Sequence, residues 1–353
     1  MKKTLLFALI ILGGALQAQV LVNEAATSLT IGNVGTDLTG VTPGQGGWTT
    51  FVATTAVPAG QNSDFQVVDK GGVYGKAFQV TGSSSATGTR WLTKDVTAVW
   101  AARTPGNNIA EVEFDMYTGP VSTSKNTQRV VFYESSARLK MLAGLMLTMD
   151  TKEIRGLAYL DPTTLGGTGA IGNYSLTLGG TPTVPAALIF LPDTWYHMAL
   201  SYNYTTGAAV FKEATGLFDK NYVGAAPSEN VGELDILAGA GTANVAASTV
   251  AYDNLNARAS ATNTLLLGVV SNQFDANNIT IYPNPASNSV TVSGRNLSLN
   301  NVEMTDVNGR VVKTINLNGV DESQIEISDL ASGVYLLKII SNEGTVTKKL
   351  VKE

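Results

Sequence analysis

The stretch AEVEFDMYTG, residues 110–119, alternates apolar and polar side chains with a period of two. Successive side chains of a β-strand point to opposite faces, so this alternation predicts a strand that buries one face and carries polar groups on the other. The side chains expected to face the core are Ala110, Val112, Phe114 and Met116. Those expected on the opposite face are Glu111, Glu113, Asp115 and Tyr117.

The same period of two recurs on both sides of this stretch. Further strand candidates are RVVFYES (129–135), ALIFL (187–191), WYHMALSYN (195–203), GAAVFKE (207–213) and AYDNLNARA (251–259). Glycine-rich stretches such as GGTGAIGN (166–173) separate them as turns. The segment SARLKMLAGLMLTMD (136–150) is compatible with a helix or with a pair of strands. Many short strands with polar turns predict an all-β antiparallel sandwich or barrel.

The composition is typical of an extracellular β protein and excludes several kinds of site. Of the 353 residues, 44% are hydrophobic, and only 14% are charged, below the roughly 25% that is usual for globular domains. The net charge is −5 and no run of Lys or Arg forms a cationic stripe, so nucleic acid is not an expected partner. The chain has no cysteine, which excludes disulfides, thiolate zinc sites and a cysteine nucleophile.

The first residues have the pattern of a secretory signal peptide. Lys2 and Lys3 form a positively charged start, and residues 4–12 are an apolar run too short for a membrane span of about 20 residues. Ala18 offers a small residue before Gln19, so we expect cleavage between them; a buried N-terminal helix is the alternative. No later apolar run reaches spanning length, so we expect no transmembrane span in the mature chain.

A domain boundary is predicted near residues 262–277, because the segment after it has a strand rhythm of its own. Its five strand regions are SVTVSG, NVEMTDVNGRVVKTINL, SQIEISDL, GVYLLKIIS and GTVTKKLVK. Asn308-Gly309 is a strong signal for a two-residue hairpin, since both turn positions favour positive φ. The predicted organisation is a signal peptide at 1–18, a first domain at 19–262, a linker at 263–277 and a small Ig-like β-sandwich at 278–353.

Four stretches of the C-terminal domain carry a resemblance to a known family. YPNPASNSVTV (282–292), DVNGRVV (306–312), LASGVYLLKI (330–339) and the basic ending TKKLVKE (347–353) have the order and spacing of those motifs in the family. The segment resembles the type A C-terminal sorting domain of the type IX secretion system of Bacteroidetes; an ordinary Ig-like adhesion module is the alternative. The residues that match the sorting motifs are Tyr282, Pro283, Asn284, Pro285, Asp306, Gly309, Gly333, Tyr335, Lys348 and Lys349.

This resemblance implies a route and a set of partners. The Sec pathway would export the chain into the periplasm, the outer-membrane translocon would recognise the C-terminal domain, and a sortase-like enzyme would commonly remove it. The first domain, the passenger, would then be secreted or joined to lipopolysaccharide at the outer cell surface.

Three stretches of the passenger resemble laminin-G-like, concanavalin-A-like jelly rolls. DTWYHMALSYNYTTGAAVFKE (193–213) resembles their central hairpin, EVEFDMYTG (111–119) an early strand, and VAYDNLNARA (250–259) the closing strand. The resemblance implies a jelly-roll sandwich over roughly residues 20–260. It leaves the function open, because this fold hosts lectins, adhesins, glycosidases and lyases.

His197 is the only histidine of the chain. A Ser-His-Asp triad needs an activated serine, but no G-x-S-x-G elbow occurs. A catalytic zinc site generally needs a second histidine or a thiolate, and the chain has neither. We therefore predict that His197 lies in a strand, packs beside Trp195 and hydrogen-bonds to a neighbouring loop.

Glu111, Glu113 and Asp115 are the candidate catalytic residues. Side chains two positions apart on a strand are about 6.5–7 Å apart, within the roughly 5–9 Å at which paired carboxylates hydrolyse glycosidic bonds. Laminarinase-type jelly rolls place Glu-x-Asp-x-Glu or Glu-x-Asp-x-x-Glu on such a strand, whereas this strand reads Glu-x-Glu-x-Asp. A solvated polar face is the alternative interpretation.

Two kinds of ligand site complete the predictions. Jelly rolls of this kind often bind one structural calcium ion, which implies a site at Asp253 in the closing strand with Glu24 in the opening strand; the alternative for Asp253 is a turn cap. No other cofactor is expected. The aromatic residues that could stack on sugar rings, with core packing as the alternative for each, are Trp48, Trp91, Trp100 and Tyr117.

The sequence thus predicts a type IX-secreted, two-domain β protein. Its passenger is interpreted as a non-catalytic binding or adhesion module for a carbohydrate or a surface partner. The alternatives are a polysaccharide-active glycosidase or lyase that uses the three carboxylates, and a purely structural surface component.

Overall fold

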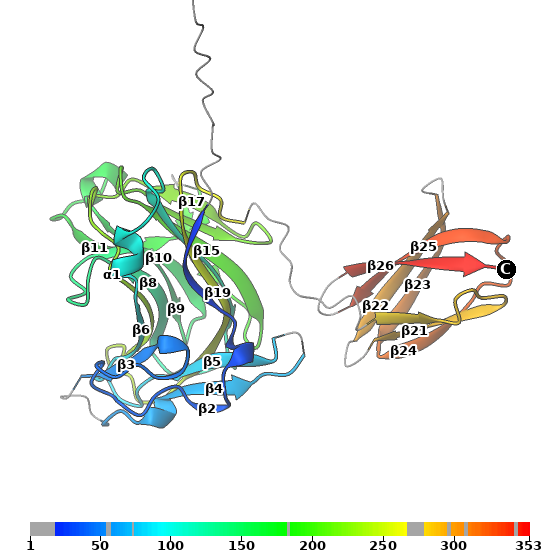
Figure 1. Cartoon of the computed structure of the whole chain (residues 1–353), viewed down its shortest axis with the longest axis horizontal. Coiled ribbons are helices and arrows are strands. Elements are labelled where there is room, and N and C mark those ends of the chain that lie inside the picture. The colour runs from blue at the N-terminus through cyan, green and yellow to red at the C-terminus, as the bar shows by residue number, and fades with distance from the viewer. Residues whose placement is uncertain are drawn as a thin grey trace, which may run out of the picture. The chain divides into compact units, whose positions relative to one another are not determined.

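The structure is a computed structural model of the whole chain. It describes residues 18–53, 58–72, 74–181, 184–266, 279–294, 298–306, 310–341 and 345–353. The chain divides into two compact units, one formed by residues 1–68 with 76–268 and the other by residues 69–75 with 269–353 (Figure 1). Of the predicted signal peptide, residues 1–17 lie outside the described residues, and β1 begins at Gln19.

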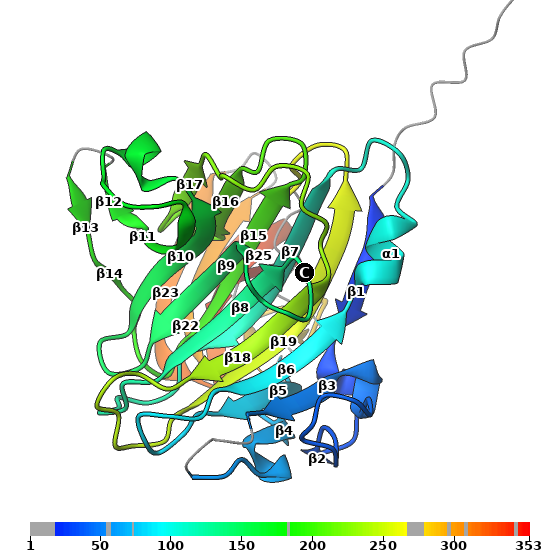
Figure 2. The ribbon, with the colours of Figure 1, turned by 90° about the vertical axis from the view of Figure 1, so that its left-hand side faces the viewer.

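The first unit is a sandwich of two antiparallel sheets, which Figure 1 shows edge-on. The nine-stranded sheet has the order β17 (Asp219–Tyr222), β16 (Ala209–Glu213), β15 (Trp195–Asn203), β7 (Ile109–Tyr117), β19 (Thr249–Ser260), β5 (Lys76–Thr81), β4 (Phe65–Asp69) and β2 (Gly32–Asn33), and β1 (Gln19–Glu24) also pairs with β19. The eight-stranded sheet, nearest the viewer in Figure 2, has the order β11 (Gly172–Thr177), β10 (Glu153–Leu160), β9 (Met141–Thr148), β8 (Thr127–Tyr133), β18 (Glu233–Gly239), β6 (Arg90–Asp95) and β3 (Thr49–Val52), with β14 (Leu188–Ile189) beside β10.

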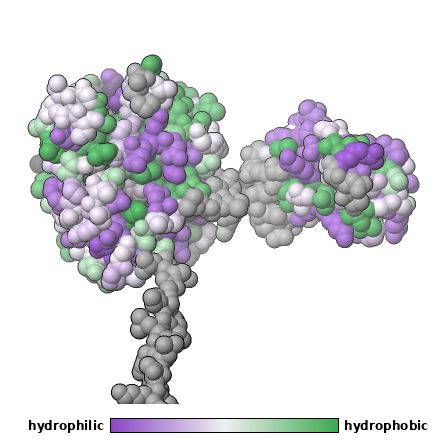
Figure 3. Space-filling view, turned by 90° about the horizontal axis from the view of Figure 1, so that it is seen from above, coloured by the Kyte–Doolittle hydropathy of each residue, from purple (hydrophilic) through white to green (hydrophobic). Residues whose placement is uncertain are grey.

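The remaining elements of this unit are short. They are β12 (Gly179–Gly180) paired with β13 (Pro185–Ala186), the helix α1 (Thr97–Ala101), and the 3-10 turns η1 (Ala26–Ser28), η2 (Gln45–Gly47), η3 (Asn62–Asp64) and η4 (Pro162–Leu165). No helix among the described residues is long and apolar enough to cross a membrane. In the direction of Figure 3, hydrophilic and hydrophobic residues intermingle on the surface of this unit.

The core lies between the two sheets and confirms the predicted strand pattern. All four apolar members of residues 110–119 are buried in it, as are the large side chains of Trp48, Trp100, Phe132 and Phe211. Burial of one such side chain stabilises a fold by about 1.5–3 kcal/mol, so this continuous cluster is the main source of stability in a chain without disulfides. The ambiguous segment 136–150 contains the strand β9 and no helix.

The chain does not leave the first unit at the end of β19. Residues 261–266, here named the strap, turn back over the outer face of the nine-stranded sheet and bind to it. The structure therefore joins residues 263–266, predicted as the start of the linker, to the passenger. Residues 267–277 of that linker lie outside the described residues.

The second unit is a smaller β-sandwich, as predicted. A three-stranded sheet has the order β20 (Ile279–Tyr282), β21 (Ser289–Gly294) and β24 (Glu322–Glu326). A four-stranded sheet has the order β23 (Val311–Val320), β22 (Leu299–Asp306), β25 (Gly333–Ser341) and β26 (Thr345–Lys352). β22 and β23 pair antiparallel across the predicted hairpin, although Asn308 and Gly309 themselves lie outside the described residues.

Candidate functional site

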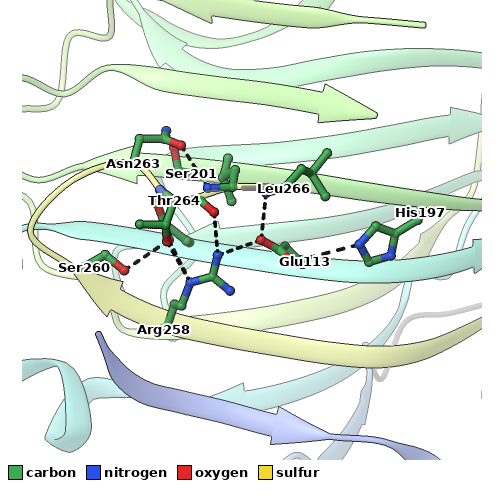
Figure 4. Close-up of polar contacts among 10 residues, drawn as sticks. Glu113, His197, Ser201, Arg258, Ser260, Asn263, Thr264 and Leu266 are labelled. Atoms are coloured by element: carbon green, nitrogen blue, oxygen red, sulfur yellow. Dashed lines mark hydrogen bonds and ion pairs between the residues drawn. The ribbon is translucent and has the colours of Figure 1, made fainter. Parts of the chain in front are cut away.

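The polar residues of β7 meet two neighbouring strands on the outer face of the nine-stranded sheet. The register places Glu111 between Ser201 of β15 and Arg258 of β19. Four residues further along the same face, Asp115 lies between His197 and Asp253. The strap crosses this face, so three strands and a following segment contribute to one polar network (Figure 4).

Glu111 and Glu113 hold the strap through Arg258. Arg258 Nε donates to Glu111 Oε2 at 2.9 Å and its Nη2 donates to Glu113 Oε1 at 2.6 Å. The backbone N–H and hydroxyl of Thr264 also donate to Glu111, and the Leu266 N–H donates to Glu113 at 3.0 Å. Glu111 is 0% exposed, which is tolerable only because the guanidinium and these donors replace its hydration.

His197 and Asp115 form the other half of the network. His197 Nδ1 lies 2.7 Å from Asp115 Oδ1, and Asn254 Nδ2 donates to Asp115 Oδ2 at 2.6 Å. The partner of His197 is thus a carboxylate on the adjacent strand, and the prediction of a loop partner is wrong. Burial opposes the charged imidazolium, but Asp115, with Glu113 at 3.9 Å from Nε2, outweighs it and raises the pKa of His197.

The geometry of this network indicates a structural role in the fold. The alternative of a solvated polar face is wrong, because Glu111 is buried beneath the strap and Asp115 is buried beside His197 and Asn254. Each of the three candidate carboxylates accepts from fixed donors of the chain. The catalytic interpretation stays a prediction, and the geometry favours a structural role because a reacting acid or base must be free to reach the proton that it transfers.

The predicted sugar-stacking aromatics fall into two groups. Trp48 and Trp100 are 0% and 1% exposed, so the prediction that they could stack on a ligand is wrong; both fill the core between the sheets. Tyr117 is half-buried on the outer face of the nine-stranded sheet, with its ring 5.4 Å from that of Trp195. Trp91 is half-buried on the outer face of the eight-stranded sheet, with its ring 5.1 Å from that of Phe51.

The outer face of the eight-stranded sheet carries a second apolar cluster, separate from the main core. Register places Trp91, Leu237 and Arg129 side by side on β6, β18 and β8. The buried members of the cluster are Val131, Tyr133, Leu157 and Leu237, with Trp91, Met141 and Met146 packed against them. A sheet that packs its inner face on the core normally exposes a polar outer face, so a buried apolar cluster on this outer face is unusual.

An ionic group lies beside this cluster. Arg138, from the loop between β8 and β9, binds Glu233 Oε2 at 2.9 Å and Asp235 Oδ2 at 2.7 Å, and its guanidinium carbon is 5.7 Å from the Trp91 ring centre. Burial raises the pKa of Asp235 to about 8, with Arg138 opposing the shift. Asp235 Oδ1 is buried without a hydrogen-bond partner among the described residues. We name Phe51, Trp91, Arg138, Glu233 and Asp235 the β6–β18 site.

A cavity of about 180 Å³ opens at this site. Phe51 contributes an aromatic wall, Thr93 a hydroxyl, and Arg138 and Glu233 charged groups. The remaining lining residues are Thr39, Gly40 and Ser136. An aromatic surface with a few convergent polar groups is the ordinary chemistry of a small-molecule pocket.

Trp91 was named as a candidate from the sequence, but the other residues of this site were missed. The signal was GELDILAG, residues 232–239, in which Glu233 and Asp235 share one strand face. Glu233-x-Asp235 has the spacing that opens the laminarinase-type pattern, as Glu113-x-Asp115 has on β7, but Leu237 and Ala238 stand where the third carboxylate would follow. Arg138 could not be assigned to it from sequence, because it lies 97 residues from Asp235 in the chain.

The predicted calcium ligands make separate contacts. Asp253 Oδ1 accepts the N–H of Ala26 at 3.2 Å, and burial raises the pKa of this carboxyl to about 6. Glu24 lies beside Lys94 and Trp48. No group of three or more His, Cys, Asp or Glu residues within the described part of the chain is arranged to hold a metal ion.

Calcium binding stays a prediction, and because Glu24 contacts Lys94 and Trp48, Asp253 is the candidate ligand to test. If the site binds calcium, millimolar calcium raises Tm by several degrees relative to EDTA, since a ligand that binds only the folded state stabilises it. Asp253→Asn should abolish that rise, whereas Glu24→Gln should leave it, because Glu24 is directed toward Lys94. Equal melting temperatures of the wild type in calcium and in EDTA would contradict the prediction.

The sorting-motif residues are distributed over the second unit. Tyr282 ends β20, Asp306 ends β22 and Gly333 begins β25. Tyr335 donates its hydroxyl hydrogen to the carbonyl of Ala331 at 2.8 Å. Lys348 and Lys349 lie in β26, and residues 283–285 follow β20 directly.

Comparison with known proteins identifies only the second unit. Three solved structures share limited likeness with the chain: a sialidase (11% identity, TM-score 0.37, 60% of this chain and 17% of that one), the binding domain of botulinum neurotoxin DC (8%, 0.40, 86% and 69%) and the Trypanosoma rangeli sialidase (10%, 0.33, 57% and 31%). The chain thus spans only 17% of the length of the first of these. A search of curated protein sequences gives no significant match.

Residues 280–353 match the family model of the secretion system C-terminal sorting domain. The match covers every strand of the second sandwich except the first residue of β20, and it confirms the resemblance seen in the sequence motifs. The second unit of this chain belongs to the sorting-domain family of the type IX secretion system, and the chain is a protein exported to the cell surface or secreted.

Proposed function

We propose that the exported passenger is a non-catalytic module that binds a carbohydrate or a surface partner at the β6–β18 site. The observation that carries the proposal is the pairing of Phe51 and Trp91 beside a cavity edged by Arg138 and Glu233. Flat aromatic rings stack on the apolar face of a sugar ring, and paired charged groups can bind its hydroxyls.

Two features favour binding over turnover. At the β6–β18 site Asp235 is 0% exposed and bound by Arg138, so of its two carboxyl groups only Glu233 lines the cavity. On the opposite sheet, the carboxylates of β7 are occupied by Arg258, His197 and the strap. Acid–base hydrolysis of a glycosidic bond requires two carboxyl groups that both reach the bond.

The test is a glycan array probed with the passenger and two variants. Trp91→Ala should weaken binding about 30-fold, because removing a central aromatic anchor costs roughly 2 kcal/mol. Tyr117→Ala is the matched control, since it removes one ring of the Tyr117–Trp195 pair on the other sheet and should leave binding unchanged.

Each alternative function has its own outcome in this experiment. Loss of binding in Tyr117→Ala but not in Trp91→Ala would move the site to the nine-stranded sheet and contradict the proposal. Release of shortened glycans, abolished by Glu113→Gln or by Glu233→Gln, would make the passenger an enzyme. If the wild-type passenger binds neither glycans nor intact cells, the result would favour the remaining alternative, a structural surface component.

A further inference from the structure

A row of side chains on the outer face of the eight-stranded sheet continues the β6–β18 site across the neighbouring strands. Strand pairing aligns Trp91, Leu237, Arg129, Met146 and Arg155 on β6, β18, β8, β9 and β10, which lie side by side in Figure 2. We name these five residues the outer row. Neighbouring strands are about 4.8 Å apart, so the outer row runs for about 19 Å from Trp91. A ligand that is longer than one sugar ring and stacks on Trp91 would therefore meet the next members of this row.

Arg129, two strands from Trp91, carries a positive charge without a counter-ion. Its Nε donates to the neutral hydroxyl of Thr127 at 3.1 Å, and no carboxylate of the described residues forms an ion pair with it. Its guanidinium lies beside Gly239, which has no side chain to cover it. Burial lowers the pKa of Arg129, with Tyr133 opposing the shift. A half-buried guanidinium that has lost part of its hydration is stabilised by an anion that reaches it.

Two other arginines of the same face differ from Arg129 in this respect. Arg138 binds both carboxyl groups of the β6–β18 site. Arg155, at the far end of the outer row, binds Glu153 through its Nε at 2.9 Å. A ligand anion that approached either of them would compete with a carboxylate of the protein. At Arg129 it would meet an uncompensated charge, so Arg129 is the favoured anion-binding position of the outer row.

We propose that the ligand of the β6–β18 site is an acidic glycan of two or more sugar units, whose carboxylate or sulfate group binds Arg129 while a sugar ring stacks on Trp91. The strands that carry the two residues are about 10 Å apart, which is why the ligand must extend beyond one ring. A guanidinium binds oxyanions through charge-assisted hydrogen bonds that are stronger than those to hydroxyls. The inference rests on the proposed function, because it takes ligand binding at Trp91 as given.

The test is an array of matched glycans, in which each backbone is present as the neutral sugar, as the uronic acid and as the sulfate ester. It is probed with the exported chain, residues 19–353. We expect the wild type to bind an acidic glycan about tenfold more tightly than the neutral glycan of the same backbone, because a charge-assisted contact adds binding energy of this order. Preference for the uronic acid or for the sulfate ester identifies the anion, and either preference supports the inference.

Three variants locate the acidic preference in the structure. Arg129→Gln should bind acidic and neutral glycans equally and keep the wild-type affinity for the neutral glycan, which also shows that the variant is folded. Arg155→Gln is the matched control, since the charge of Arg155 is already balanced by Glu153, and it should keep the preference. Arg129→Lys retains the charge without the forked donors, so its preference should fall about threefold.

The outcomes separate this inference from the proposed function. If the wild type binds neutral and acidic glycans equally well, the inference is overturned and the proposed function stands. An acidic preference that survives in Arg129→Gln, or that is lost to the same extent in Arg155→Gln, overturns the inference as well. If Arg129→Gln does not fold, an unchanged preference in Arg129→Lys overturns it. If the chain binds no glycan in any form, the inference fails together with the carbohydrate-binding function.

Discussion

Replacing Arg258 with alanine is expected to lower the free energy of unfolding of the passenger by about 3–5 kcal/mol. Arg258 is 17% exposed in its side chain and neutralises Glu111, which is 0% exposed, together with Glu113. The variant would leave a carboxylate buried without its counter-ion, and it would also remove the bonds from Arg258 to the hydroxyl and the carbonyl of Thr264. Urea unfolding of the passenger, residues 19–268, measures the loss.

Three further variants serve as comparisons for Arg258→Ala. Lys212→Ala breaks the exposed pair with Asp219, at 3.4 Å, and should cost only about 0.2–1 kcal/mol. Arg258→Lys keeps the charge but not the forked geometry, so it should fall between the two. Glu111→Gln keeps the shape and removes the buried charge, and it should cost less than Arg258→Ala. If Arg258→Ala is no less stable than Lys212→Ala, the network does not hold the strap.

The stability of the passenger is expected to fall by about 2 kcal/mol or more as the pH rises from 5 to 8.5. Burial raises the pKa of Asp235 to about 8 and that of Asp253 to about 6, so the folded chain holds protons that the unfolded chain has already lost above pH 4. The raised pKa of His197 also lowers the stability as the pH rises. The charged imidazolium stabilises the fold fully below pH 6.5, and this stabilisation is lost as the imidazolium deprotonates. Unfolding in urea at the two pH values measures the difference.

The variant Asp235→Asn tests the largest contribution. Asparagine has the shape of the neutral acid and cannot ionise, so it should flatten the decrease between pH 5 and 8.5. Asp219→Asn is the control, because Asp219 has 68% of its side chain exposed and should leave the slope unchanged. A wild-type stability that rises over this range would show that Asp235 and Asp253 are ionised in the folded state and would contradict the assignment.

The strand pattern around residues 110–119 was predictable because burial of one face imposes a period of two on any strand. The same pattern could not show that the polar face is buried as well. That burial comes from Thr264 and Leu266, 153 residues away from Glu111 and Glu113 in sequence, and from Arg258 on a neighbouring strand. Contacts of such range depend on the sheet order, which alternation alone does not encode.

The aromatic residues illustrate the same limit. Trp48 lies in a glycine-rich segment that resembles a surface loop in sequence, yet its ring is in the core, 5.4 Å from that of Phe78. Trp91 lies half-buried on an outer face and stays a candidate for ligand stacking, but its partners Phe51 and Arg138 come from distant parts of the chain. The sorting domain was the easier part to predict, because its signals are short local motifs with fixed spacing.

The strap also decides how the passenger responds to force. When the exported passenger is held through its C-terminal end, tension enters the fold beyond Leu266 and reaches the Glu113–Leu266 and Glu111–Thr264 bonds before it reaches β19. These bonds can break one after another. The backbone hydrogen bonds that pair β19 with β7, by contrast, must break together along the whole length of the strands. The strap would therefore extend first under shear flow and lengthen the tether while both sheets, and the β6–β18 site, stay folded.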